Sequence, residues 1–167
     1  MNILKIVMLV AAATLVAPAV AQDKGAGKAA PETKGAMNME ILRDKIKADK
    51  KLIVARNMNL TDAEAKAFWP VYEAYQKELG AINDRLIKTI LAFADAYNKG
   101  AMTNETAKKL LGEALAIEKA ELKLKQSYVP RLEKALPQIK LVRYIQIENK
   151  IRAVVKYGVA DNIPLVE

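Results

Sequence analysis

Apolar side chains recur every three or four residues along most of the chain, which is the period of an α-helix. The longest such stripe holds Phe68, Tyr72, Tyr75, Leu79, Ile82, Leu86, Ile90, Phe93 and Tyr97. It predicts a long amphipathic helix that packs against other helices. Three weaker stripes predict further helices, marked by Leu42, Ile46 and Ile53, by Ala107, Leu110, Ala114, Ile117, Leu124, Tyr128 and Leu132, and by Leu141, Tyr144, Ile147, Ile151 and Val154. The first of these covers about 39–56, and Asp49 interrupts its stripe.

The long helix has the clearest start signal in the chain. Thr61 is a typical N-cap, Glu64 follows three residues later, and Leu60 precedes the cap. This order matches a capping box, in which the threonine and glutamate side chains each accept a hydrogen bond from the first helical turn.

The other helix boundaries follow from local residue chemistry. Gly100 suits the left-handed residue that ends a helix, and Thr103 is an N-cap for the next one. Pro137, which follows Leu136, is well placed as the first residue of the last helix. We expect that helix to stop at Gly158 and residues 159–167 to form an extended tail.

Two prolines interrupt the long stripes without changing their phase. Pro70 lies thirty residues before Gly100 and Pro130 lies thirty after it. We expect a kink at each, about 45 Å from the turn, although each proline could instead begin or end a shorter helix. The predicted fold is therefore all-α, with four helices dominated by a curved, proline-kinked antiparallel hairpin.

The N-terminus has the organisation of an export signal. Lys5 is followed by an apolar run over 6–16 and by the small residues 19–21, so residues 1–21 read as a cleavable signal peptide. A retained membrane anchor is the alternative, but the run is short for a bilayer span. Residues 22–37 resemble a flexible linker, which leaves 38–158 as the helical domain. These features predict a periplasmic protein.

The chain contains neither Cys nor His. Nucleophilic pairs with histidine and ordinary zinc sites are thereby excluded, and we expect no enzymatic activity and no cofactor. The acid pairs Asp62 with Glu64 and Glu118 with Glu121 are better explained as solvated or lysine-paired groups. Four methionines could bind a soft metal or serve as packing residues: Met37, Met39, Met58 and Met102.

The formal net charge is +8, which favours acidic polypeptides or anionic lipid as partners. Export makes nucleic acid the least expected partner. The candidate contact residues are Lys123, Arg131, Lys134, Lys140, Arg143, Lys150 and Arg152, which could equally be a solvated helix face. Trp69 could contact a client or a second subunit, or pack in the core.

The segments 60–72 (LTDAEAKAFWPVY) and 136–152 (LPQIKLVRYIQIENKIR) resemble the Spy and CpxP family of periplasmic envelope-stress proteins. The family carries two LTxxQ motifs at helix starts. Here Glu64 replaces the first glutamine, and Pro137 stands where the second motif has threonine. Both segments also resemble the family branch described as sensors linked to extracytoplasmic-function sigma factors.

The resemblance implies an antiparallel homodimer of bent hairpins with a cradle-like concave surface. It also implies an ATP-independent chaperone for unfolded proteins, with a dedicated partner that restrains an envelope sensor protein as the alternative. A binder of anionic membrane or envelope surface is a third expectation. Some family members bind zinc, but this chain lacks the histidine that such a site would need.

Overall fold

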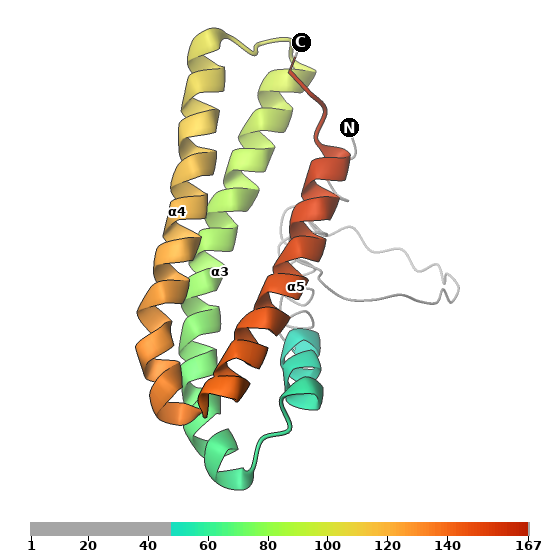
Figure 1. Cartoon of the computed structure of the whole chain (residues 1–167). Coiled ribbons are helices and arrows are strands. Elements are labelled where there is room, and N and C mark those ends of the chain that lie inside the picture. The colour runs from blue at the N-terminus through green and yellow to red at the C-terminus, as the bar shows by residue number, and fades with distance from the viewer. Residues whose placement is uncertain (1–47, 167) are drawn as a thin grey trace, which may run out of the picture.

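The computed structural model describes residues 48–166, and this part of the chain is all-α (Figure 1). A helical segment over 48–58 is followed by α3 (Asp62–Asn98), α4 (Asn104–Ala135) and α5 (Gln138–Asn162). No strand occurs among these residues, so the predicted fold class is confirmed. The predicted signal peptide, the linker and the beginning of the first predicted helix lie outside the described residues.

The capping box at the start of α3 is confirmed. The Thr61 backbone N–H donates to the Glu64 carboxylate at 2.7 Å, and the Thr61 hydroxyl accepts from the Glu64 backbone N–H at 3.3 Å. Just upstream, Asn59 has a φ of 46°, a left-handed conformation that asparagine tolerates better than most residues. Asn59 therefore ends the 48–58 segment and lets the chain turn into the cap.

α3 and α4 lie antiparallel and are joined by a tight turn (Figure 1). α3 ends at Asn98, and Gly100 has a φ of 62°, as its position at the turn predicts. The Thr103 hydroxyl then accepts a hydrogen bond from the Thr106 backbone N–H at 3.1 Å, which confirms Thr103 as the N-cap of α4.

Both helices continue through their prolines. Pro70 lies inside α3 and Pro130 lies inside α4, so the alternative of a helix boundary at either one is wrong. Both prolines are exposed, so water can hydrate the backbone carbonyls that lack a partner one turn earlier. The hydrogen bond from the Tyr128 hydroxyl to the Glu78 carboxylate fixes the register and places the prolines near the same height. Their role as hinges stays a prediction.

The limits of α5 differ from those expected. Pro137 is the N-cap, so the helix begins one residue later at Gln138, and it runs to Asn162 past the predicted stop at Gly158. The Asn162 side chain donates to the Gly158 carbonyl at 2.8 Å. The predicted tail thus begins too early, because the residue that ends the helix is Pro164, which disfavours helical backbone at Ile163.

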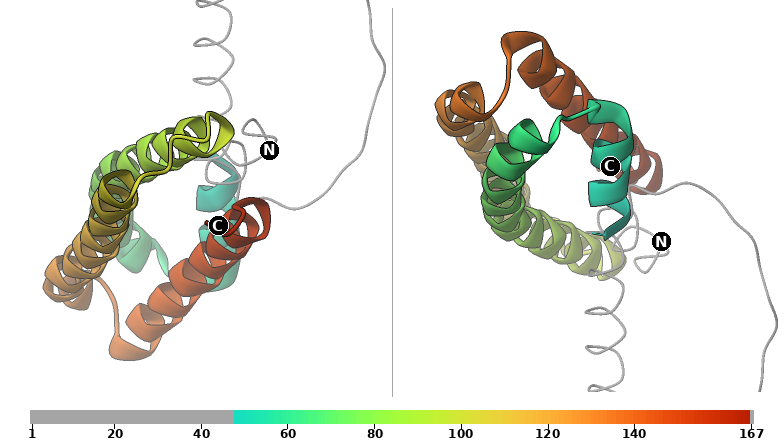
Figure 2. Two further views of the ribbon diagram at one scale, coloured as in Figure 1. Left: turned by 90° about the horizontal axis from the view of Figure 1, so that it is seen from above. Right: turned by 90° about the horizontal axis from the view of Figure 1, so that it is seen from below.

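α5 lies across the hairpin at a wide spacing from α3 (Figure 2). No Cα atom of α5 comes within 8 Å of a Cα atom of α3, whereas α3 and α4 approach closely along their length. Large side chains fill much of the gap. The main core cluster consists of Val54, Met58, Phe68, Tyr72, Tyr75, Leu79, Leu124, Tyr128, Leu132, Leu136, Leu141 and Tyr144.

Two predicted stripes are shifted by one residue. In α5 the buried residue is Val155, whereas Val154 is 59% exposed. In the 48–58 segment Val54 and Met58 are fully buried, whereas Ile53 is only half-buried. In α5 the shift arises at Glu148, which is buried on the inner face although it is polar. A stripe drawn through apolar residues alone therefore passes it by and continues to Val154 instead of Val155.

Candidate functional site

A groove lies where the wide spacing between α3 and α5 leaves room. It has a volume of about 700 Å³, and the 48–58 segment and α4 also contribute to its lining. Its walls combine apolar side chains such as Leu79, Ile87 and Val155 with polar groups from all four helical segments. Whether the groove can bind a ligand depends on whether these polar groups are already paired within the protein.

Glu148 is at the centre of the first polar network. Its side chain is 4% exposed and accepts hydrogen bonds from the Lys50 ammonium at 2.8 Å and the Gln76 amide at 2.9 Å. Lys50 also donates to the Gln76 side-chain oxygen at 2.8 Å. The network ties α5 to α3 and to the 48–58 segment, and it compensates the charge that α5 buries.

Arg152 forms the second network one turn further along α5. Its Nε donates to the Glu121 carboxylate of α4 at 2.8 Å, and its Nη1 donates to the Asn83 side chain of α3 at 2.9 Å. Both ionic side chains are largely buried, at 13% and 11% exposure. Each network pairs opposite charges within the protein. The charged side chains of the groove would therefore have to give up these partners before they could bind a ligand.

Three tyrosines of the core, Tyr72, Tyr75 and Tyr144, lie beside the first network. Burial raises the pKa of Tyr144, and the nearby Glu148 carboxylate raises it further. Burial and the same carboxylate also raise the pKa values of Tyr72 and Tyr75. These phenols therefore stay protonated at neutral pH, and they act as packing and hydrogen-bonding groups.

Three of the predicted contact cations have intramolecular partners. Arg152 is paired with Glu121, and Lys140 bonds to the Glu64 carboxylate and to the Asn59 carbonyl, the latter at 2.8 Å. The Lys140 hydrogen bond, followed by that from the Thr61 backbone, lowers the pKa of Glu64. Arg131 lies over the ring of Tyr128, 4.7 Å from its centroid. Arg152 and Lys140 therefore join α5 to other helices, whereas Arg131 contacts a residue of its own helix.

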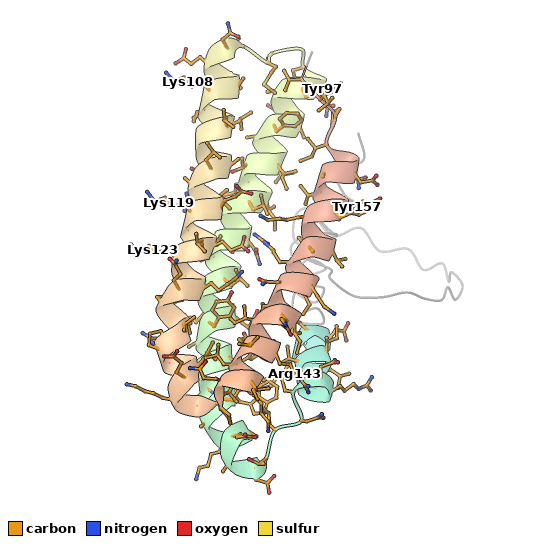
Figure 3. All side chains as sticks on the ribbon, in the orientation of Figure 1. Tyr97, Lys108, Lys119, Lys123, Arg143 and Tyr157 are labelled. Carbon is orange, nitrogen blue, oxygen red and sulfur yellow. The ribbon has the colours of Figure 1, made fainter. Side chains whose placement is uncertain are left out.

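The remaining candidates, Lys123, Lys134, Arg143 and Lys150, are exposed and have no ion pair within residues 48–166. They do not converge on one hollow. Figure 3 shows Lys123 pointing outward from α4, away from α3, whereas Arg143 extends from α5. The structure therefore distributes the cations over separate helix faces.

Trp69 belongs to the aromatic part of the core. It is half-buried, and its ring meets those of Phe68 and Tyr72 edge-on at centroid distances of 5.0 and 5.3 Å. The Lys51 ammonium lies 5.2 Å from its centroid. Of the alternatives given for Trp69, packing in the core agrees with these contacts.

The acidic and methionine candidates are separated from one another. Glu118 pairs with Lys156 at 3.1 Å, whereas Glu121 pairs with Arg152, so the two carboxylates serve different bridges. Met58 is fully buried in the core, and Met102 lies in the turn before α4. Met37 and Met39 lie outside the described residues. Among those residues no cluster of acidic side chains could hold a metal ion.

An apolar face of α5 that shares only Val154 with the predicted stripe is open to solvent. Ile139, Val142, Val154 and Tyr157 are 80%, 51%, 59% and 75% exposed. Ile139 and Tyr157 lie eighteen residues apart, which is five helical turns, so both point in the same direction. A helical wheel of the whole segment would have revealed this second apolar face, because α5 has apolar residues on opposite sides.

The α5 face also has a shallow depression that polar side chains border. Ile139 and Val142 line a small hollow together with Gln138, Arg143 and Gln146. Figure 3 shows Tyr157 pointing away from α3 and α4.

In the part of the chain that the structure describes, no helix is both long enough and apolar enough to span a bilayer. A comparison with known protein families, curated proteins and solved structures finds no match for this chain.

Proposed function

We propose that the protein is a periplasmic, ATP-independent chaperone or stress adaptor that binds apolar segments of other polypeptides on the outer face of α5. The observation that carries this proposal is a broken row of exposed apolar side chains on one face of α5, with Ile139 and Val142 at one end and Val154 and Tyr157 at the other. Exposed apolar side chains that share one helix face and are bordered by polar residues mark interaction sites on proteins.

The dimensions of the face suit a polypeptide better than a small molecule. The row extends over about 27 Å of helix, and the exposed side chains of Arg143, Gln146 and Lys150 lie between its two apolar pairs. Tyrosine adds a large contact area with a polar tip, a combination that is common in protein interfaces. The hollow at Val142 can receive one side chain of the partner.

Arg143 and Lys150 supply the electrostatic part of the proposal. Both are exposed on α5, and neither has an ion pair among the described residues. Positive charge beside an apolar row speeds the encounter with acidic segments, and apolar contacts then slow dissociation. Capture should therefore become slower at high salt without being lost.

The test is suppression of aggregation by the mature chain, predicted to begin at Gln22, measured by light scattering with several unrelated unfolded proteins. The triple variant I139Q/V142Q/Y157Q should bind on the order of a hundredfold more weakly, because each of the three buried apolar side chains contributes at least about 1 kcal/mol. The control L52Q/L91Q removes exposed leucines elsewhere and should protect as the unmodified chain does.

Equal protection by the triple variant would refute binding through α5. A chain that protects no client but binds one membrane sensor tightly would instead be a dedicated regulatory partner. The homodimer that the family resemblance implies also belongs to this proposal, and sedimentation of the mature chain tests it.

A further inference from the structure

The outer face of α4 carries a second row of exposed apolar side chains. Leu111, Leu115 and Leu122 are 61%, 57% and 56% exposed. At 100° per residue they fall within an arc of about 40°, so they form one narrow ridge. The ridge is distinct from the buried side of α4, where Ile117 and Leu124 pack.

Three lysines run beside this ridge. Lys108, Lys119 and Lys123 are exposed, and Figure 3 shows all three pointing away from α3. None of them forms a hydrogen bond or an ion pair within residues 48–166, whereas Glu118 on the other flank is already paired with Lys156. The ridge therefore has free positive charge on one side and neutralised charge on the other.

We propose that this α4 face docks on an anionic lipid surface. Leucines that enter the boundary between headgroups and acyl chains, flanked by lysines that reach lipid phosphates, form the pattern of helices that lie on membranes. The charge is complementary to anionic headgroups, and each lysine near such a surface strengthens binding about fivefold. Three leucines alone bury too little area, so both parts are needed.

The shape of the face favours a lipid surface over a polypeptide. The leucines form a single ridge on a convex helix, and a planar interface can contact all three leucines together with the neighbouring lysines. The proposed polypeptide site lies on a different helix, so the two activities can be removed separately. This inference does not depend on the polypeptide-binding proposal.

The experiment is co-sedimentation of the mature chain with phosphatidylcholine vesicles that either contain or lack an equal part of phosphatidylglycerol. We expect binding only to the anionic vesicles. The variant K108Q/K119Q/K123Q should bind on the order of a hundredfold more weakly. The control R56Q/K66Q/K88Q changes the net charge equally at exposed positions elsewhere and should keep most of the binding.

A second variant tests the apolar part. L111Q/L115Q/L122Q should also lose vesicle binding, while circular dichroism and aggregation suppression stay unchanged. Equal losses in the lysine variant and its control would overturn the proposal, because net charge alone would then explain binding. Loss of aggregation suppression with unchanged vesicle binding in the leucine variant would assign the ridge to polypeptides and would also overturn it.

Discussion

Position 148 of α5 places a carboxylate where an apolar residue would be expected. Glu148 is buried, and its charge is compensated by Lys50 and Gln76. Once one partner of such a pair is removed, the other charge is left in a poorly solvated place, which costs more than the intact pair contributes. The pair therefore selects one position of α5 among the alternatives that the apolar contacts alone would allow.

Replacing Glu148 by alanine should lower the free energy of unfolding by about 3 kcal/mol, because the Lys50 ammonium loses its buried partner. Urea unfolding followed by circular dichroism measures this change. The comparison is Glu73→Ala, which removes the exposed pair with Lys51 and should cost less than about 1 kcal/mol. Equal costs at the two positions would mean that burial does not control the strength of the pair.

At the scale of single elements, two glycines allow the cost of a left-handed backbone to be compared with the effect of helix propensity. Gly100 has a positive φ in the α3–α4 turn, and Gly112 lies inside α4. Neither would place an added Cβ within 4 Å of another atom. A change to alanine therefore acts at both positions through the backbone alone.

Gly100→Ala should destabilise the protein by about 1 kcal/mol, because a left-handed conformation is unfavourable for alanine. Gly112→Ala should stabilise it by up to about 1 kcal/mol, because alanine loses less conformational entropy in a helix. Thermal unfolding of the two variants gives opposite shifts in Tm. Shifts of the same sign would show that the turn does not hold Gly100 in its left-handed conformation.

The elements that could be predicted from the sequence are those set by neighbouring residues. Thr61, Gly100 and Thr103 determine helix ends by contacts within one turn, and all three predictions are confirmed. The inner face of α5 depends instead on distant partners, so Glu148 and Val155 were not identified. The exposed row on α5 could not be predicted for the same reason, because the packing of α5 against α3 and α4 determines which of its faces is covered.

At the scale of the whole molecule, the buried tyrosines couple stability to alkaline pH. Burial raises the pKa of Tyr72, Tyr75 and Tyr144 above the ordinary value of 10.0, whereas an unfolded chain would lose these protons near that value. Their contribution is therefore complete below pH 10 and decreases as the pH rises above it.

We expect the free energy of unfolding to fall above pH 10 by about 1.4 kcal/mol per pH unit for each of these tyrosines. Tyrosine ionisation, followed by ultraviolet absorbance, should coincide with the loss of helical circular dichroism. The variant Tyr75→Phe should show a smaller slope. Ionisation that precedes the loss of helix would mean that these side chains are accessible to solvent in the folded protein.

The wide separation of α3 and α5 has a consequence for motion. α5 is joined to the other segments by core side chains such as Leu141 and Tyr144 and by long charged side chains, as in the pairs of Lys50 with Glu148 and Arg152 with Glu121. Any tilt of α5 would have to break the contacts of Tyr144 with Phe68 and Tyr75 together with these ion pairs, so we expect the groove to keep its width.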